Sequence, residues 1–171
     1  MTSPDANAYE PIRQLAARYA LAMDSRDFAG IAALFTEDCA TLGGATGRAA
    51  VEAEFTKGFR TGTGGRVGFT LVGGHVIDLV DADHARGSVH CLAELGDDDR
   101  WVRQAIVYQD DYERHDGRWL FARRDHQLFY GVELDERPLA QPPADWPRGI
   151  VGRGTLPYAW PTWRAFVGEP G

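Results

Sequence analysis

A stripe of apolar residues at helical spacing opens the chain. Ile12, Leu15, Tyr19 and Met23 recur every three or four positions, and polar residues fill many of the positions between them. This periodicity predicts an amphipathic helix over residues 8–25, with the apolar stripe facing a core.

Two shorter helices are expected after it. Asp27 can cap the first, whose buried face is apolar: Phe28, Ile31, Leu34 and Phe35. Thr46 is expected to cap the second, in which three bulky side chains line up: Val51, Phe55 and Phe59. Between these helices we expect a short strand at residues 39–42.

The pattern changes to β-type alternation beyond the glycine-rich segment 62–68. It predicts four long strands, at roughly 66–80, 84–95, 100–114 and 118–132. Aspartates occupy the joints, and Asp116-Gly117 between the last two strands is a strong hairpin signal. Helices followed by an antiparallel meander predict an α+β fold.

The last part of the chain has a different composition. Residues 138–170 hold seven of the nine prolines and three of the five tryptophans: Trp146, Trp160 and Trp163. Proline excludes regular helix interiors, while each tryptophan has a large apolar area to bury. We therefore expect a main domain at 1–137 and an extension at 138–171. The extension packs on its own domain, covers a pocket mouth or crosses to a neighbouring subunit.

Length and charge narrow the class of protein. A chain of 171 residues fits one domain, and its net charge of −7 without a basic run argues against nucleic-acid binding. No apolar run is long enough to span a membrane, and the polar N-terminus lacks a signal-peptide core. With only two cysteines, the chain is expected to be cytoplasmic. Its five histidines lack metal-ligand spacing and no phosphate loop occurs, so neither metal nor cofactor is expected.

Several short motifs together resemble a known family. They are Arg18-Tyr19-Ala20 with Asp24, the run Ile31–Asp38, His75–Asp78, the stretch Tyr108–Trp119, and Arg123–His126. Over roughly residues 8–132 the pattern is similar to the SnoaL-like branch of the nuclear transport factor two-like superfamily. That branch includes polyketide cyclases, scytalone dehydratase, bile-acid dehydratase and lindane dehydrochlorinase. The resemblance implies a cone-shaped α+β barrel, with three helices packed on a curved, mostly antiparallel sheet.

The resemblance also suggests catalytic residues. Asp24 matches an aspartate that orients or activates a catalytic histidine in the dehydrochlorinase and in bile-acid dehydratase. Its alternative is a solvated loop residue or a cap for the next helix. Arg124 aligns with the catalytic arginine of the dehydrochlorinase and can stabilise an anion, although a purely structural role is equally open. Tyr19 is a candidate hydrogen-bond donor to a substrate, or a core aromatic.

The catalytic histidine is the position at which the match fails. The dehydrochlorinase histidine falls on Thr70, which cannot act as a base. His75 would face the right side of the strand only with a bulge at Gly73-Gly74, and His90 and His126 are the other candidate bases. Substrate contacts are expected from Tyr19, Thr70, His90 and Tyr108.

Two functions remain open. The first is a cofactor-independent lyase or dehydratase, isomerase or cyclase that acts on a hydrophobic, ring-containing small molecule. In it, His75 or His126 moves the proton, Asp24 orients that histidine and Arg124 steadies the developing charge. The second is a non-catalytic small-molecule-binding or oligomer-assembly protein of the same fold, which the threonine at position 70 favours.

An oligomer is expected in either case. The strand at residues 100–112 carries apolar side chains on both faces, so one face should meet something besides the domain's own helices. Family members form dimers and trimers, and we expect a homo-oligomer of one of these kinds.

Overall fold

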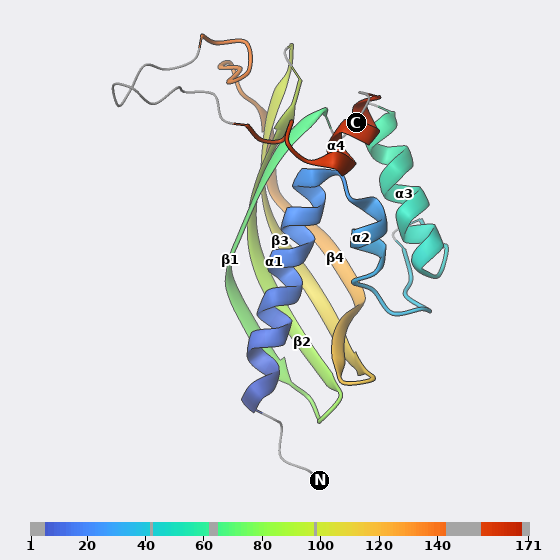
Figure 1. Cartoon of the computed structure of the whole chain (residues 1–171). Coiled ribbons are helices and arrows are strands. Elements are labelled where there is room, and N and C mark those ends of the chain that lie inside the picture. Colours follow the sequence, from blue (N-terminus) through green and yellow to red (C-terminus); the bar gives the residue numbers. More distant parts are fainter. Residues whose placement is uncertain (1–5, 42, 62–64, 98, 143–154, 169–171) are drawn as a thin grey trace.

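The computed structural model describes residues 6–41, 43–61, 65–97, 99–142 and 155–168. Its helices are η1 (Ala6–Ala8, a 3-10 turn), α1 (Tyr9–Ser25), α2 (Phe28–Ala32), α3 (Arg48–Arg60) and α4 (Pro161–Val167). Its strands are β1 (Val67–Leu79), β2 (His84–Gly96), β3 (Trp101–His115) and β4 (Arg118–Glu133). The first three α-helices lie on one side of a curved sheet, and α4 lies at the end where α1 and α3 finish (Figure 1). None of the described helices combines the length and hydropathy needed to cross a bilayer.

The helical half follows the sequence pattern, with one shift. Asp27 caps α2 by accepting a hydrogen bond from the backbone N–H of Gly30 at 2.8 Å. The N-cap of α3 is Gly47 rather than Thr46, because its φ of 91° suits glycine. The strand expected at residues 39–42 is wrong: Leu42 lies outside the described residues, and Ala40 makes only an isolated bridge.

The strands form one antiparallel sheet in the order β1-β2-β3-β4, which confirms the α+β prediction. Their ends lie within about two residues of the expected ones because turn-forming residues mark the joints. At the last joint Asp116 and Gly117 both have positive φ, 50° and 78°, as a tight hairpin turn requires.

The bulge on which the assignment of His75 depends is present in β1. The register shifts between Gly73 and His75, and Gly74 takes a φ of 57°. An extra residue reverses the alternation of side chains, so His75 points to the helix-covered face like Thr70. The register between β3 and β4 shifts at two further places, which adds to the curvature of the sheet.

The main core lies between the sheet and the helices. It is built from the predicted stripe of α1 and from the inward side chains of the strands. A second, smaller core joins Val67 and Trp101 to Trp163 of α4, which is 1% exposed. The indole of Trp163 donates a hydrogen bond to the carbonyl of Arg66 at 2.7 Å. The described part of the extension is therefore packed on its own chain, whereas Trp146 lies outside the described residues.

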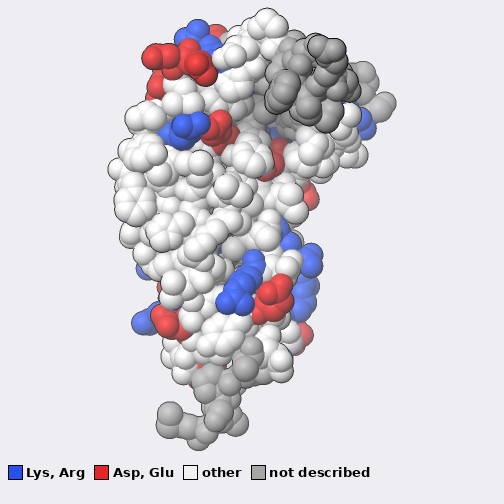
Figure 2. All heavy atoms as spheres, turned by 90° about the vertical axis from the view of Figure 1, so that its left-hand side faces the viewer, with Lys and Arg blue, Asp and Glu red and all other residues white. Residues whose placement is uncertain are grey.

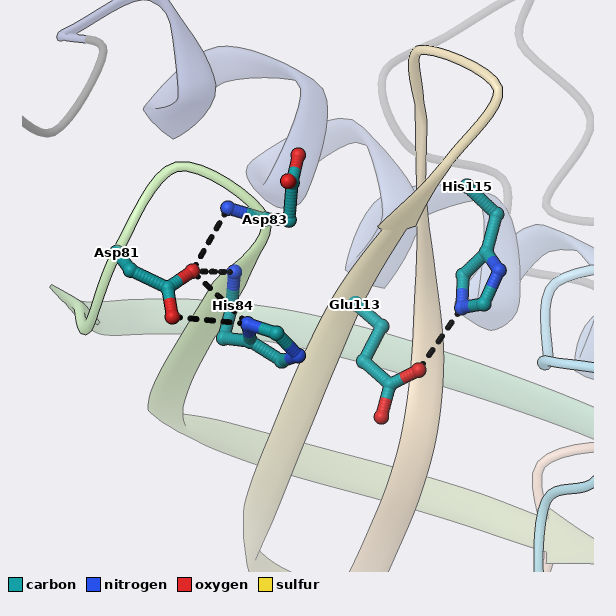
Figure 3. A network of polar contacts seen from close by, with 5 residues as sticks. All are labelled: Asp81, Asp83, His84, Glu113 and His115. Atoms are coloured by element: carbon teal, nitrogen blue, oxygen red, sulfur yellow. Dashed lines mark hydrogen bonds and ion pairs between the residues drawn. The ribbon is translucent and has the colours of Figure 1, made fainter. Parts of the chain in front are cut away.

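Exposed polar contacts lie at the end of the sheet opposite to α4 (Figure 3). The carboxylate of Asp81 accepts hydrogen bonds from the backbone N–H groups of Asp83 and His84 and also binds the His84 ring, at 2.8 Å for each closest contact. His115 contacts Glu113 across 2.8 Å. These groups organise the turns, and neither histidine faces the helices.

Candidate functional site

A cavity of about 360 Å³ lies between the helix-covered face of the sheet and helices α1 and α3. Its size is at the lower end of the range for small-molecule pockets, roughly 300–1,000 Å³. Apolar side chains form much of its wall, including Met23, Val51, Phe55, Phe59 and Ile106. Between them lie polar side chains from several elements: Tyr19, Arg26, Thr70, Tyr108, Arg124 and His126.

Arg124 and Asp110 form a buried ion pair beside this cavity. They oppose each other on β4 and β3, and two hydrogen bonds of 2.8 and 2.6 Å join them. The guanidinium carbon lies 4.1 Å from the ring centroid of Phe121, 4.2 Å from that of Tyr108 and 4.4 Å from that of Tyr19. Burial acts to lower the pKa of Arg124, but the hydrogen bonds and charge of Asp110 raise it overall. Arg124 is therefore a fixed, charged part of the wall.

The hydroxyl groups of Tyr19 and Tyr108 add hydrogen-bond donors next to Arg124. Their rings pack edge to face, with centroids 5.8 Å apart. Burial raises the pKa of Tyr19 to about 12 and that of Tyr108 well above its ordinary value. Both phenols therefore keep their protons at neutral pH and can donate hydrogen bonds.

His126 is the histidine that lines the cavity. It opposes Tyr108 in the sheet register, and the two ring centroids are 5.6 Å apart in an edge-to-face contact. The ring is half-buried. An imidazole beside a phenol donor is a pairing that can move protons.

Asp24 lies behind the cavity wall rather than in it. Its side chain is buried at the end of α1, and the hydroxyl and backbone N–H of Thr70 favour its charged form. Burial raises the pKa of the Asp24 carboxyl; the bonds from Thr70 and the charge of Arg26 counter this in part. The atom Oδ1 has no hydrogen-bond partner among the described residues. The groups that favour the charged form of Asp24 are thus Thr70 and Arg26, and no histidine is among them.

His75 is directed away from the cavity into a separate hydrogen-bonded chain. Its Nε2 lies 3.0 Å from the hydroxyl of Tyr112, which donates to Asp110 at 2.8 Å. Asp110 in turn holds Arg124. The bulge brings His75 to the expected face, but it reaches the cavity only through these intermediaries.

His90 lies on the outer face of the sheet. Its ring stacks on that of Phe129, with centroids 6.2 Å apart and planes within 5°. This places it across the sheet from Thr70 and Tyr108, so the substrate contact predicted for His90 does not agree with the structure.

Sequence comparison decides the family. The model of the SnoaL-like domain matches residues 4–125. The chain belongs to the SnoaL-like family. Its membership confirms the resemblance drawn from the motifs and, with the structural neighbours, places it in the nuclear transport factor two-like superfamily. No curated protein matches the chain.

Solved structures show the same fold. A Novosphingobium aromaticivorans protein, named after scytalone dehydratase, is 26% identical, with a TM-score of 0.67 over 80% of this chain and 94% of its own. A hexachlorocyclohexane dehydrochlorinase from Novosphingobium barchaimii is 20% identical, with a TM-score of 0.66 over 75% and 91%. A Mycobacterium tuberculosis protein of unknown function is 24% identical, with a TM-score of 0.63 over 96% and 92%.

The motif comparison did not identify some of the groups in this SnoaL-like site. Asp110 alternates with Tyr108 and Tyr112, so strand periodicity alone places it on their buried face, where a carboxylate needs a cation. Arg26 gave no such signal, because the groups that bury it come from β1, α3 and the segment before β1, which are distant in the sequence. The wall also includes Thr41, whose hydroxyl oxygen has no hydrogen-bond partner in the described chain.

Proposed function

We propose that this SnoaL-like protein is a cofactor-independent acid–base enzyme, a lyase or isomerase, acting on a ring-containing small molecule in the cavity. The observation that carries the proposal is the meeting of His126, Tyr108 and Arg124 on one wall of a cavity of about 360 Å³. Names of structural neighbours, a dehydratase and a dehydrochlorinase, agree with chemistry that breaks a C–H bond without a cofactor.

The arrangement supports a specific division of labour. His126 removes a proton from a carbon next to a substrate carbonyl and becomes an imidazolium, and the C–H electron pair moves into an enolate. Tyr108 and Tyr19 donate hydrogen bonds to the enolate oxygen, since their raised pKa values keep them protonated. The imidazolium then returns the proton, either to another carbon in an isomerisation or to a departing hydroxide in an elimination, which releases water.

One observation favours the alternative, a non-catalytic small-molecule-binding protein. The carboxylate of Asp24 is favoured by Thr70 and Arg26, and not by the histidine that the resemblance assigns to it. In that case the cavity would bind its ligand and the polar groups would only orient it.

Hydrogen exchange separates the two functions. The protein is incubated in D₂O with 1-tetralone, a two-ring ketone with exchangeable hydrogens next to its carbonyl, and deuterium uptake is followed by mass spectrometry. We expect exchange above the buffer rate, and we expect His126→Gln to lower it by roughly 100-fold, the low end of general-base contributions.

The control for this experiment is His115→Gln, which removes an exposed histidine at the far end of the sheet. It should exchange 1-tetralone at the wild-type rate. Binding of 1-tetralone without exchange by the wild type would favour the binding protein, and equal exchange by His126→Gln would remove His126 as the base.

We also propose that the protein is a homo-oligomer that buries the outer face of the sheet. Large apolar side chains gather there and are between 38% and 69% exposed: Phe69, Leu71, Leu92, Phe129, Tyr130 and Val132. The middle of this face carries almost no charge (Figure 2). Such a face suits a second copy of the same chain, because an uncharged patch does not repel itself.

A further inference from the structure

A second arginine, Arg26, lies on the cavity wall and differs from Arg124 in its pairing. It is 4% exposed and follows α1 directly, with a φ of 58°. Its guanidinium donates hydrogen bonds to the carbonyls of Met23 and Gly65. Its Nε has no hydrogen-bond partner, and no carboxylate forms an ion pair with it, among the residues that the structure describes. Arg124, in contrast, is paired with Asp110.

The guanidinium of Arg26 occupies a close-fitting position. Its carbon lies 4.6 Å from the centroid of the Phe59 ring, which also lines the cavity. Gly68 of β1 also lies close to it, and a Cβ added there would come within 3.1 Å of Nη2 and 3.3 Å of Nη1. An alanine at position 68 would therefore crowd the guanidinium, which would have to shift by a few tenths of an ångström.

The C-terminal helix α4 supports the same position from outside. The hydroxyl of Thr162 donates to the carbonyl of Ser25 at 2.7 Å, one residue before Arg26. The indole of Trp163 donates to the carbonyl of Arg66, one residue after the Gly65 carbonyl that Arg26 binds. Thus α4 holds together the two backbone segments between which Arg26 is fixed.

A buried cation without a paired carboxylate is costly unless a partner compensates it. Arg26 is nevertheless charged at neutral pH: burial lowers its pKa to about 10, while Asp24 and Asp97 oppose the decrease from beyond contact distance. A ligand anion in the cavity would supply the missing partner, since guanidinium groups favour carboxylates.

We propose that Arg26 is a specificity-determining residue that binds a carboxylate group of the cavity's ligand. This inference rests on the proposed function, because it assumes that the cavity binds a ring compound. Along α1, Arg26 lies seven residues beyond Tyr19, which corresponds to about 10 Å of helix rise. The ligand therefore places its carboxylate at the Arg26 end and its reacting ring near Tyr108, Arg124 and His126.

A matched pair of ring compounds tests the proposal. Naphthalene-2-carboxylate and its neutral amide, naphthalene-2-carboxamide, have nearly the same shape and differ in charge. Binding to the full chain at neutral pH is measured by calorimetry. We expect the wild type to bind the carboxylate about tenfold more tightly than the amide, and Arg26→Gln to bind both equally.

Two control variants separate the effect of Arg26 from that of overall charge and of folding. Lys57→Gln removes an exposed positive charge from α3 and should keep the tenfold preference. Gly68→Ala keeps every charge but crowds the guanidinium and should weaken the preference, whereas Gly73→Ala, with open space around an added Cβ, should not. Should Arg26→Gln fail to fold, the comparison of Gly68→Ala with Gly73→Ala decides.

The outcomes distinguish this inference from the proposed function. Carboxylate preference that persists in Arg26→Gln and Gly68→Ala would overturn the role of Arg26 and leave the acid–base proposal standing. A wild type that binds neither naphthalene compound would overturn the inference together with the assumed ring-binding cavity. Equal binding of both compounds by the wild type would overturn the inference alone.

Discussion

Asp110 and Arg124 oppose each other on neighbouring strands and are joined by two hydrogen bonds in a region that solvent does not reach. The exposed fractions of their side chains are 0% and 3%. The pair lies between the cavity, which Arg124 lines, and His75, which reaches Asp110 through Tyr112. The pair thereby fixes Arg124, and the part of the cavity wall that Arg124 forms, relative to the sheet.

Removing one member of this pair should destabilise the fold strongly. Asp110→Asn leaves a buried guanidinium without its counter-charge, and we expect a loss of about 3–5 kcal/mol in the free energy of unfolding. Urea denaturation measures the loss. The matched control is Asp125→Asn, which breaks a half-exposed contact with Arg123 and should cost under about 1 kcal/mol. Equal losses in the two variants would contradict a structural role for the buried pair.

Asp24→Asn should stabilise the protein at neutral pH. Burial raises the pKa of Asp24, so the carboxyl favours folding while protonated and loses this contribution as the pH rises through its folded-state pKa. At pH 7 the wild type therefore bears the cost of a buried charge with an unpaired oxygen, of the order of 1 kcal/mol.

The measurement for Asp24 is the melting temperature of wild type and variant between pH 3.5 and 7.5. The advantage of Asp24→Asn should be present at pH 7 and disappear toward pH 4, whereas Asp78→Asn, an exposed change on β1, should show no such trend. A variant less stable than the wild type at pH 7 would show that the charged carboxylate supports the fold.

Most of the fold could be predicted from local patterns in the sequence. The features that were not predicted depend on tertiary contacts. Alternation and aspartate-rich joints located the strands because each signal lies within a few residues. The N-terminus of α3 moved to Gly47 because a positive φ outweighed the capping preference of Thr46. At the site, motif matching led to Tyr19, Tyr108 and Arg124. It could not lead to Arg26, whose partners come from β1, α3 and the segment before β1.

His75 should carry its proton on Nε2 at neutral pH. The single hydroxyl proton of Tyr112 is donated to Asp110, so the short contact between Tyr112 and His75 requires a hydrogen from the ring. Nitrogen-15 NMR correlations of the imidazole distinguish the two tautomers. The Nδ1-protonated form would show that Tyr112 donates to His75 and that the chain to Asp110 is interrupted.

The same histidine should make stability depend on pH. Burial lowers the pKa of His75; Asp110 opposes this, and Arg124 and Arg13 reinforce it. The unfolded chain therefore binds the proton more readily, so stability is full above pH about 6.5 and falls as the pH drops through the folded-state pKa. The free energy of unfolding is measured by urea titration at several pH values. In His75→Gln it should fall less between neutral and acidic pH than in the wild type, and the difference should be under about 1 kcal/mol because the ring is half-exposed. His115→Gln should leave the His75 contribution in place.

Leu71→Asp should dissociate the oligomer. Leu71 lies on the outer face of the sheet, across which Leu92 and Phe129 are also exposed, and a carboxylate there would face its own copy across a symmetric contact. Light scattering should give the wild type a multiple of the 18.9 kDa chain mass and the variant the mass of one chain. The matched control is Leu21→Asp, an equally exposed leucine on α1, which should remain oligomeric. A wild type of single-chain mass would contradict the homo-oligomer, and an oligomer that persists in Leu71→Asp would move the contact to another surface.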